Sequence, residues 1–125
     1  MSFKKLGLSD ELLNAIQAKG YSQTTPVQEK AIPFIMQGLD ILAGAQTGTG
    51  KTAAFALPIL NRLQQSESKR RRIRALVLTP TRELASQVGD SFRDYGSNLR
   101  FKTAVIYGGV SIKTQKDKIR NGIDI

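Results

Sequence analysis

One stretch of the sequence decides the fold: Asp40-Ile41-Leu42-Ala43-Gly44-Ala45-Gln46-Thr47-Gly48-Thr49-Gly50-Lys51-Thr52. A short aliphatic run precedes a glycine-containing loop, and helix-compatible residues follow, which is the order of a phosphate-binding loop (P-loop). Gly48 and Gly50 let the backbone turn so that successive N–H groups point at phosphate oxygens. The positive end of the following helix adds to this attraction. The stretch therefore predicts a nucleoside triphosphate site.

The side chains after the glycines complete the predicted site. Lys51 brings a mobile cation to the β- and γ-phosphates, and the hydroxyl of Thr52 suits Mg²⁺ coordination. We predict Lys51 and Thr52 as the catalytic candidates, Thr52 as the metal ligand, and a nucleotide-binding loop of Ala45, Gln46, Thr47, Gly48, Thr49, Gly50, Lys51 and Thr52. The strict pattern has glycine at position 45, and alanine fits there if its φ is negative. The alternative is a glycine turn that only packs a helix on a sheet.

Aliphatic runs alternate with helical patterns on both sides of the loop. Buried strands are predicted at residues 40–45, 73–79 and 102–107, with helices at 51–64, 81–98 and 111–120. Strands that alternate with helices predict right-handed crossovers and a mostly parallel sheet covered on both faces. The predicted fold class is therefore α/β, a three-layer P-loop nucleoside-triphosphatase domain over residues 39–125.

Two helices are predicted before the loop, within residues 1–38. The first spans residues 9–19 and ends at Gly20. The second starts at Thr25-Pro26-Val27-Gln28, which combines a capping box with proline in the first helical position, and it continues toward Gly38. Pro33 falls inside this helix and should kink it, because proline removes one backbone hydrogen bond.

The last residues resemble the beginning of another strand. Gly122 is expected to end the helix before it, and Ile123-Asp124-Ile125 is an aliphatic start. We therefore expect a fragment of a longer domain, truncated at its C-terminus. The alternative is a frayed tail.

Composition limits the available chemistry and partners. The 125 residues form one domain, and the absence of cysteine and histidine excludes disulfides, thiolate metal sites and a histidine base. A net charge of +9 favours a polyanionic partner such as nucleic acid. No apolar run approaches the roughly 20 residues that cross a bilayer, and no signal peptide is recognised. We expect a soluble cytoplasmic protein.

The motifs together resemble the bacterial type of DEAD-box ATP-dependent RNA helicase over almost the whole chain. In that family an adenine-reading segment precedes the P-loop, and here it corresponds to Gly20-Tyr21-Ser22-Gln23-Thr24-Thr25-Pro26-Val27-Gln28, with Phe3 upstream. The resemblance implies a RecA-like domain in which residues 1–38 form the adenine-recognition (Q-motif) region. It also implies that Gln28 binds the adenine edge, and that Tyr21 and Phe3 wall the base.

A glutamine in this role is chemically reasonable. Its amide offers one donor and one acceptor group, which match N7 and N6 of adenine, so ATP is the expected nucleotide. As alternatives, Gln28 can serve only the capping box, and the two aromatic residues can simply pack against the first helix. Both roles of Gln28 can hold at once. The family usually has proline in place of Thr24, which could loosen the loop, and isoleucine in place of Val27.

Two further motifs point to RNA. Pro80-Thr81-Arg82-Glu83-Leu84-Ala85 resembles the family's first RNA-contacting motif, and Gly108-Gly109 resembles the glycine pair that lets an RNA backbone approach. The RNA-binding candidates are Pro80, Thr81, Arg82, Gly108 and Gly109. The alternatives are a capped helix start and an ordinary turn. The basic run Lys69-Arg70-Arg71-Arg72 is either a solvated loop or a source of non-specific phosphate affinity.

The resemblance implies ATP-driven RNA unwinding with ATP and Mg²⁺ as cofactors. The family's acidic Asp-Glu-Ala-Asp motif and its second domain are absent from residues 1–125. We therefore expect the isolated chain to be at most a weak nucleotide binder that needs the C-terminal remainder of a helicase core for activity. Two alternatives stay open: another P-loop ATPase that acts on DNA, and a non-enzymatic nucleic-acid-binding module with a vestigial loop.

Overall fold

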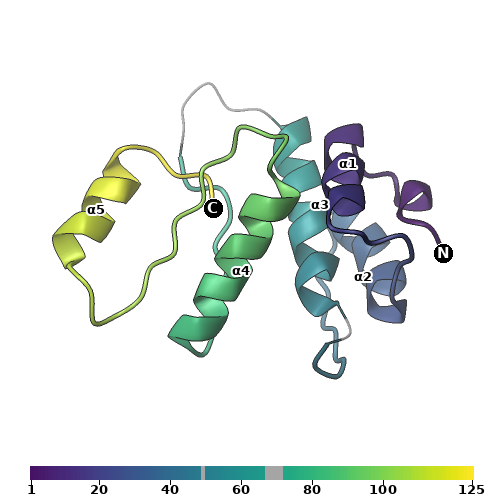
Figure 1. The fold of residues 1–125 in the computed structure, drawn as a ribbon, viewed down its shortest axis with the longest axis horizontal. Coiled ribbons are helices and arrows are strands. Elements are labelled where there is room, and N and C mark those ends of the chain that lie inside the picture. Colours follow the sequence, from purple (N-terminus) through teal and green to yellow (C-terminus); the bar gives the residue numbers. More distant parts are fainter. Residues whose placement is uncertain (49, 67–71) are drawn as a thin grey trace.

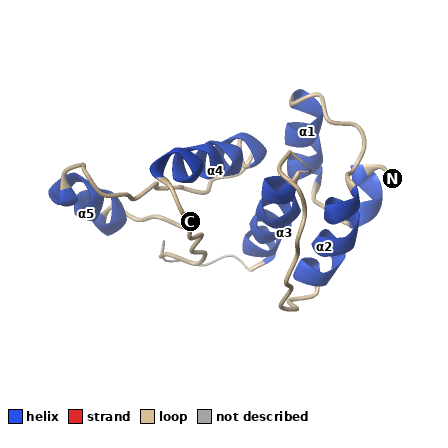
Figure 2. Cartoon of the chain, turned by 90° about the horizontal axis from the view of Figure 1, so that it is seen from below, coloured by secondary structure: helices blue, strands red, loops and turns tan. Residues whose placement is uncertain are grey.

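The computed structural model describes residues 1–48, 50–66 and 72–125 (Figure 1). Helices make up its regular structure, and no strand is formed within these ranges, as Figure 2 shows. The elements are one short 3-10 helix, η1 (Phe3–Leu6), and five α-helices, α1 (Asp10–Ala18), α2 (Pro26–Met36), α3 (Lys51–Gln65), α4 (Arg82–Tyr95) and α5 (Ile112–Arg120).

Both predicted N-terminal helices are confirmed. The Ser9 hydroxyl accepts the Leu12 N–H at 3.4 Å to start α1, and Gly20 follows its end with a φ of 80°. At the start of α2 the side-chain oxygen of Gln28 accepts the Thr25 N–H at 3.0 Å, as the capping box predicts. Pro33 lies inside α2, which nevertheless continues to Met36.

The three later helices are also confirmed, with one earlier end. The Thr81 hydroxyl caps α4 by accepting the Leu84 N–H at 3.1 Å, and the Ser111 hydroxyl caps α5. Helix α4 ends at Tyr95 rather than near residue 98, because the chain turns at Gly96, whose N–H still bonds the Phe92 carbonyl at 2.9 Å. Helix boundaries therefore follow the caps and not the hydrophobic pattern alone.

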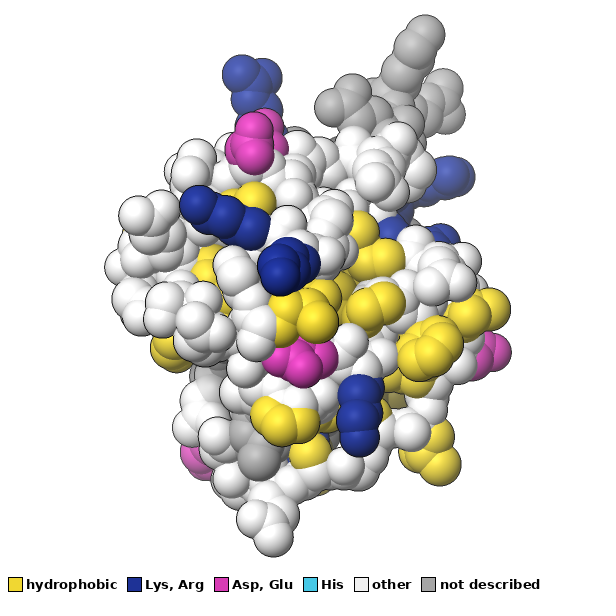
Figure 3. Space-filling view, turned by 90° about the vertical axis from the view of Figure 1, so that its right-hand side faces the viewer, with side chains coloured by type: hydrophobic (Ala, Val, Ile, Leu, Met, Phe, Trp, Pro, Cys, Tyr) yellow, Lys and Arg dark blue, Asp and Glu magenta, His cyan; other side chains and the backbone are white. Residues whose placement is uncertain are grey.

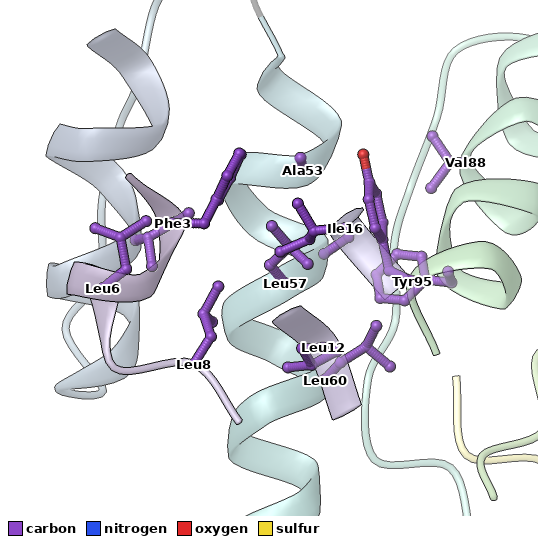
Figure 4. Packing of buried hydrophobic residues seen from close by; sticks show 13 residues of the cluster. Phe3, Leu6, Leu8, Leu12, Ile16, Ala53, Leu57, Leu60, Val88 and Tyr95 are labelled. Atoms are coloured by element: carbon purple, nitrogen blue, oxygen red, sulfur yellow. The ribbon is translucent and has the colours of Figure 1, made fainter. Parts of the chain in front are cut away.

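The core surrounds α3. In Figure 1 this helix lies between α2 and α4, with α1 beside it, and Figure 4 shows side chains from η1, α1 and α4 meeting it. Leu57 and Leu60 of α3 are fully buried. Asn61 is also buried and accepts the Ser9 N–H at 2.9 Å through its side-chain oxygen, so a polar contact inside the core links α3 to the start of α1.

The three predicted strands are not formed in the described residues. Residues 40–45, 73–79 and 102–107 carry no ladder of backbone hydrogen bonds, and the prediction that they are buried is wrong for several of them. Leu42, Leu76 and Leu78 have relative exposures of 102%, 79% and 86%. A strand forms only when a neighbouring segment supplies hydrogen bonds along its length. Here the three segments follow one another in the predicted order, but no neighbouring segment among the described residues bonds to any of them along its whole length.

Among the described residues, two of these segments begin to pair with Ile123–Ile125. The Asp124 carbonyl accepts the N–H groups of Arg74 and Ala75 at 2.8 and 3.2 Å. On its other side, the same tripeptide exchanges backbone bonds with Lys102 and Ala104 at 2.9 to 3.2 Å. Ile123 and Asp124 are 9% and 6% exposed, so the frayed-tail alternative is wrong. The tripeptide joins residues 74–75 to residues 102–104, as the start of a strand between them would.

The uncovered segments leave apolar surface. An open groove of about 810 Å³ lies between α2 and residues 39–45, where Phe34 and Leu39 are about half exposed. Figure 3 views the side of the molecule that carries the N-terminal helices and shows hydrophobic side chains among lysines and arginines on this face. Such a lining suits apolar side chains and not a triphosphate.

Tyr95 makes the packing of α4 dependent on pH. Its side chain is buried in the core, and the Lys19 ammonium lies 4.9 Å from the ring centroid and 3.0 Å from Asp94. Burial raises the pKa of Tyr95 to about 12, with smaller contributions from Tyr21 and Asp94. The folded state therefore favours the protonated phenol more strongly than the unfolded state does.

We expect this phenol to destabilise the fold only at high pH. Its contribution is fully present below pH 10, the ordinary pKa, and is lost as the pH rises to 12. The expected loss of unfolding free energy is about 1–2 kcal/mol. A full shift of two pKa units would correspond to a somewhat larger value. Urea unfolding at pH 9 and pH 11 should show this loss in the wild type and a smaller one in Tyr95→Phe, which has no ionisable phenol. Equal losses in both proteins would contradict the prediction.

Candidate nucleotide and RNA site

The loop between residue 45 and α3 has the backbone that the sequence predicts. Gly48 and Gly50 have φ angles of 81° and 83°, in the left-handed region that glycine tolerates. No non-glycine residue in the described ranges has a positive φ, so Ala45 meets the condition under which alanine replaces glycine. The departure from the strict pattern at Ala45 therefore costs the loop no backbone strain.

The amide groups of the loop are available to an anion. Helix α3 begins at Lys51 without a side-chain cap, and its first bond runs from Ala54 N–H to Gly50 O at 3.1 Å. Among bonds between described residues, the backbone N–H groups of Thr47, Gly48, Gly50 and Lys51 donate to no protein carbonyl. In a purely structural turn these donors would bond to water, whereas in a nucleotide site they would face an anion.

The loop side chains are placed as an open site requires. Gln46, Thr47 and Gly48 are exposed, as is the Lys51 side chain, and Thr52 is half-buried in the first turn of α3. Thr49 lies outside the described residues. The lysine and threonine predicted as catalytic candidates thus begin the same helix, directly after the left-handed Gly50.

Gln28 connects the N-terminal region to this loop. Its residue is 5% exposed, its Oε1 accepts the Thr25 N–H at 3.0 Å, and its Nε2 donates to Gly50 O at 3.2 Å. An amide has two donor hydrogens and two acceptor lone pairs, so one of each remains for a ligand. The capping role is confirmed, and it is compatible with the predicted adenine contact.

The two aromatic candidates are placed differently. Phe3 is 5% exposed and belongs to the core cluster, as the packing interpretation predicts, whereas Tyr21 is 51% exposed. Thr24 tethers its loop, contrary to the expectation that it loosens it. Its N–H donates to Met1 O at 2.9 Å, and its hydroxyl donates to Glu29 at 2.6 Å, which lowers the pKa of that carboxyl group. Proline could form neither bond.

The RNA candidates meet around Arg82. Its guanidinium carbon lies 4.9 Å from the ring centroid of Tyr107, and a Cβ built on Gly109 would lie 3.1 Å from its Nη1. Gly109 also has a φ of 82°, and this left-handed backbone favours glycine there. Pro80, Thr81 and Gly108 are exposed nearby in the sequence. The sequence interpretation did not include Tyr107, because a contact between side chains so far apart leaves no local pattern.

The remaining predicted features add little to the description of the site. Residues 69–71 of the basic run lie outside the described residues, and Arg72 is exposed. In the described ranges, no group of three or more His, Cys, Asp or Glu side chains could hold a metal ion. No helix in those ranges is long and apolar enough to span a membrane.

A glycine loop with open amides in front of a helix, together with alternating helices and sheet-like segments, defines the class of P-loop α/β proteins. The family model described as DEAD/DEAH box helicase matches residues 25–125. The chain belongs to this family.

Curated relatives agree with this assignment. The DEAD-box ATP-dependent RNA helicase RhpA of Helicobacter pylori is 50% identical over 119 residues, which are 95% of this chain and 23% of that protein. The ATP-dependent RNA helicase CshA of Limosilactobacillus reuteri is 44% identical over 92% of this chain and 22% of its own length. The chain thus spans less than a quarter of the length of these relatives.

Solved structures show the fold. A DEAD box protein from the hyperthermophile Methanococcus jannaschii superposes with a TM-score of 0.89 at 42% identity, covering 99% of this chain and 33% of that one. The RNA-helicase Prp28 from Chaetomium thermophilum bound to ADP gives 0.88 at 39% identity, covering 99% and 31%. The predicted RecA-like α/β class is confirmed: the backbone follows this fold although no strand is formed in the described residues.

Proposed function

We propose that this chain is the ATP-binding part of an ATP-dependent RNA helicase, with residues 1–38 as its adenine-recognition region and residues 39–125 as part of its RecA-like domain. The observation that carries the proposal is the bond from Gln28 Nε2 to Gly50 O at 3.2 Å. It places a glutamine amide, with one further donor hydrogen and one further acceptor lone pair, beside a loop in which the described N–H groups of Gly48 and Gly50 donate to no protein carbonyl. An adenine nucleotide fits both features, because its base can pair with the glutamine amide and its phosphates can accept the loop N–H groups.

Each part of the loop has a separate task in this proposal. The N–H groups around Gly48 and Gly50 bind phosphate oxygens, and the ammonium of Lys51 neutralises charge on the outer phosphates. The Thr52 hydroxyl is the ligand offered to Mg²⁺, which when bound compensates the charge of the phosphates. Tyr21 is exposed and can cover the base, whereas Phe3 supports this region from the core.

RNA is the proposed polyanionic partner. Arg82, at the start of α4, and the Gly108-Gly109 pair form one surface, where a guanidinium and open backbone suit a phosphodiester chain. Hydrolysis also needs a carboxylate that positions water. We infer that this carboxylate and the RNA-dependent motion belong to the remainder of the helicase core, and that the 125-residue chain alone binds nucleotide weakly.

The adenine contact predicts the effect of Gln28→Ala. We expect ATP affinity to fall about tenfold, which corresponds to one or two hydrogen bonds, while GTP affinity stays low and nearly unchanged. Fluorescent-nucleotide titrations with ATP and GTP as competitors measure both affinities. Gln17→Ala, which removes an exposed glutamine from α1, is the matched control and should change neither.

The same titrations separate the alternatives. In another P-loop ATPase, Gln28 is only a capping residue, so its loss would weaken ATP and GTP binding equally. In a nucleic-acid-binding module with a vestigial loop, neither nucleotide would bind measurably in the wild type. A preference for ATP that survives Gln28→Ala would overturn the adenine contact.

A further inference from the structure

Arg82 and Tyr107 make a side-chain contact that no local sequence pattern predicts. The two residues are far apart in the sequence, yet the guanidinium of Arg82 lies over the Tyr107 ring, with its carbon 4.9 Å from the ring centroid. This distance is within the range of a cation–π interaction. Tyr107 is half-buried and Arg82 is exposed, so the ring is the more firmly held partner.

The position of Tyr107 is itself fixed by α5. Its backbone N–H donates to the side-chain oxygen of Gln115 at 2.9 Å. Gly108 and Gly109 follow directly, and the Arg82 Nη1 lies so close to Gly109 that a Cβ there would be 3.1 Å away. The start of α4 and residues 107–109 thus meet around one guanidinium. Helix α5 holds Tyr107 through Gln115.

An arginine placed over a ring keeps donors for a ligand. The guanidinium carries five N–H donors, and a single ring cannot engage all of them. No ion pair between described residues involves Arg82. The arrangement therefore removes much of the rotational freedom of an exposed arginine without using all of its donors, which reduces the entropy lost when an anion binds.

We propose that Tyr107 is a positioning residue for RNA: its ring holds the Arg82 guanidinium beside the Gly108-Gly109 backbone, with its N–H edge directed to a phosphate of the RNA backbone. This inference rests on the proposed function, because it assigns to Arg82 a phosphate contact. The role of Tyr107 depends on the face of its ring and not on its hydroxyl.

The test compares Tyr107→Leu with Tyr107→Phe in the natural full-length protein. Binding of a fluorescein-labelled ten-nucleotide oligo(U) RNA is measured by anisotropy, with Mg²⁺ and a non-hydrolysable ATP analogue present. We expect Tyr107→Leu to weaken binding two- to fivefold, the range of an exposed cation–π contact, and Tyr107→Phe to bind like the wild type. Nucleotide affinity should remain unchanged in both variants.

A double-mutant cycle with Arg82→Ala separates positioning from packing. Arg82→Ala should weaken RNA binding and lower the slope of log affinity against log salt by about one. In that background Tyr107→Leu should have no further effect. An equal effect of Tyr107→Leu in both backgrounds, or none in the wild type, overturns the inference and leaves the helicase proposal intact. Unchanged binding in Arg82→Ala overturns the RNA contact itself.

Discussion

Lys51→Ala is expected to weaken ATP binding about a hundredfold. Lys51 is exposed at the first position of α3. Among bonds between described residues, its own N–H and those of Gly48 and Gly50 donate to no protein carbonyl. A hydrogen-bonded charge pair of this kind contributes roughly 1.5–3 kcal/mol, and the amides alone cannot replace it. Isothermal titration calorimetry with Mg²⁺ and ATP measures the change.

The control for this variant is another exposed lysine. Lys113→Ala changes the net charge equally but lies on α5, so nucleotide affinity should stay within twofold of the wild type. If both variants lose the same affinity, the effect is one of overall charge. If neither loses any, the loop does not bind the nucleotide through Lys51.

Gly50→Ala is expected to destabilise the fold by about 3 kcal/mol or more. Gly50 has a φ of 83°, which costs alanine roughly 1–2 kcal/mol. In addition, an added Cβ would lie 2.2 Å from Gln28 Nε2. Gly48→Ala is the matched control: it has almost the same φ, and a Cβ there meets nothing within 4 Å. Gly48→Ala should therefore show only the backbone cost in urea unfolding.

The difference between the two alanine variants measures how closely Gln28 packs on the loop. In a Gln28→Ala background this close contact is absent, so Gly50→Ala should cost about as much as Gly48→Ala. Equal losses for the two glycine variants in the wild-type background would mean that Gln28 moves aside freely. The link between the N-terminal region and the loop would then be weak.

The helices could be predicted from the sequence because their signals are local. The Thr25 capping box, the Gly20 stop and the apolar patterning predict the five α-helices without any tertiary contact. The resemblance added the family, which the comparison with family models confirms. The residue roles within the site stay predictions.

The strands and the side-chain contacts could not be predicted in the same way. Residues 40–45 have the composition of a buried strand, but burial and pairing depend on neighbours that composition does not specify. The same holds for Asn61, whose side chain supports the start of α1, and for Tyr107 beneath Arg82. An aromatic residue directly before a glycine pair was the available signal for Tyr107, and its partner could not be identified from spacing.

The bonds made by Ile123–Ile125 have a consequence for the order of folding. Helices α2 and α3 follow each other directly along the chain, so packing them closes only a short loop. By contrast, the tripeptide joins Arg74 and Lys102, and each junction must close a longer stretch of chain before any bond is gained. We infer that α2 and α3 pack early and that Ile123–Ile125 joins residues 74–75 and 102–104 later, since local contacts generally form faster than distant ones.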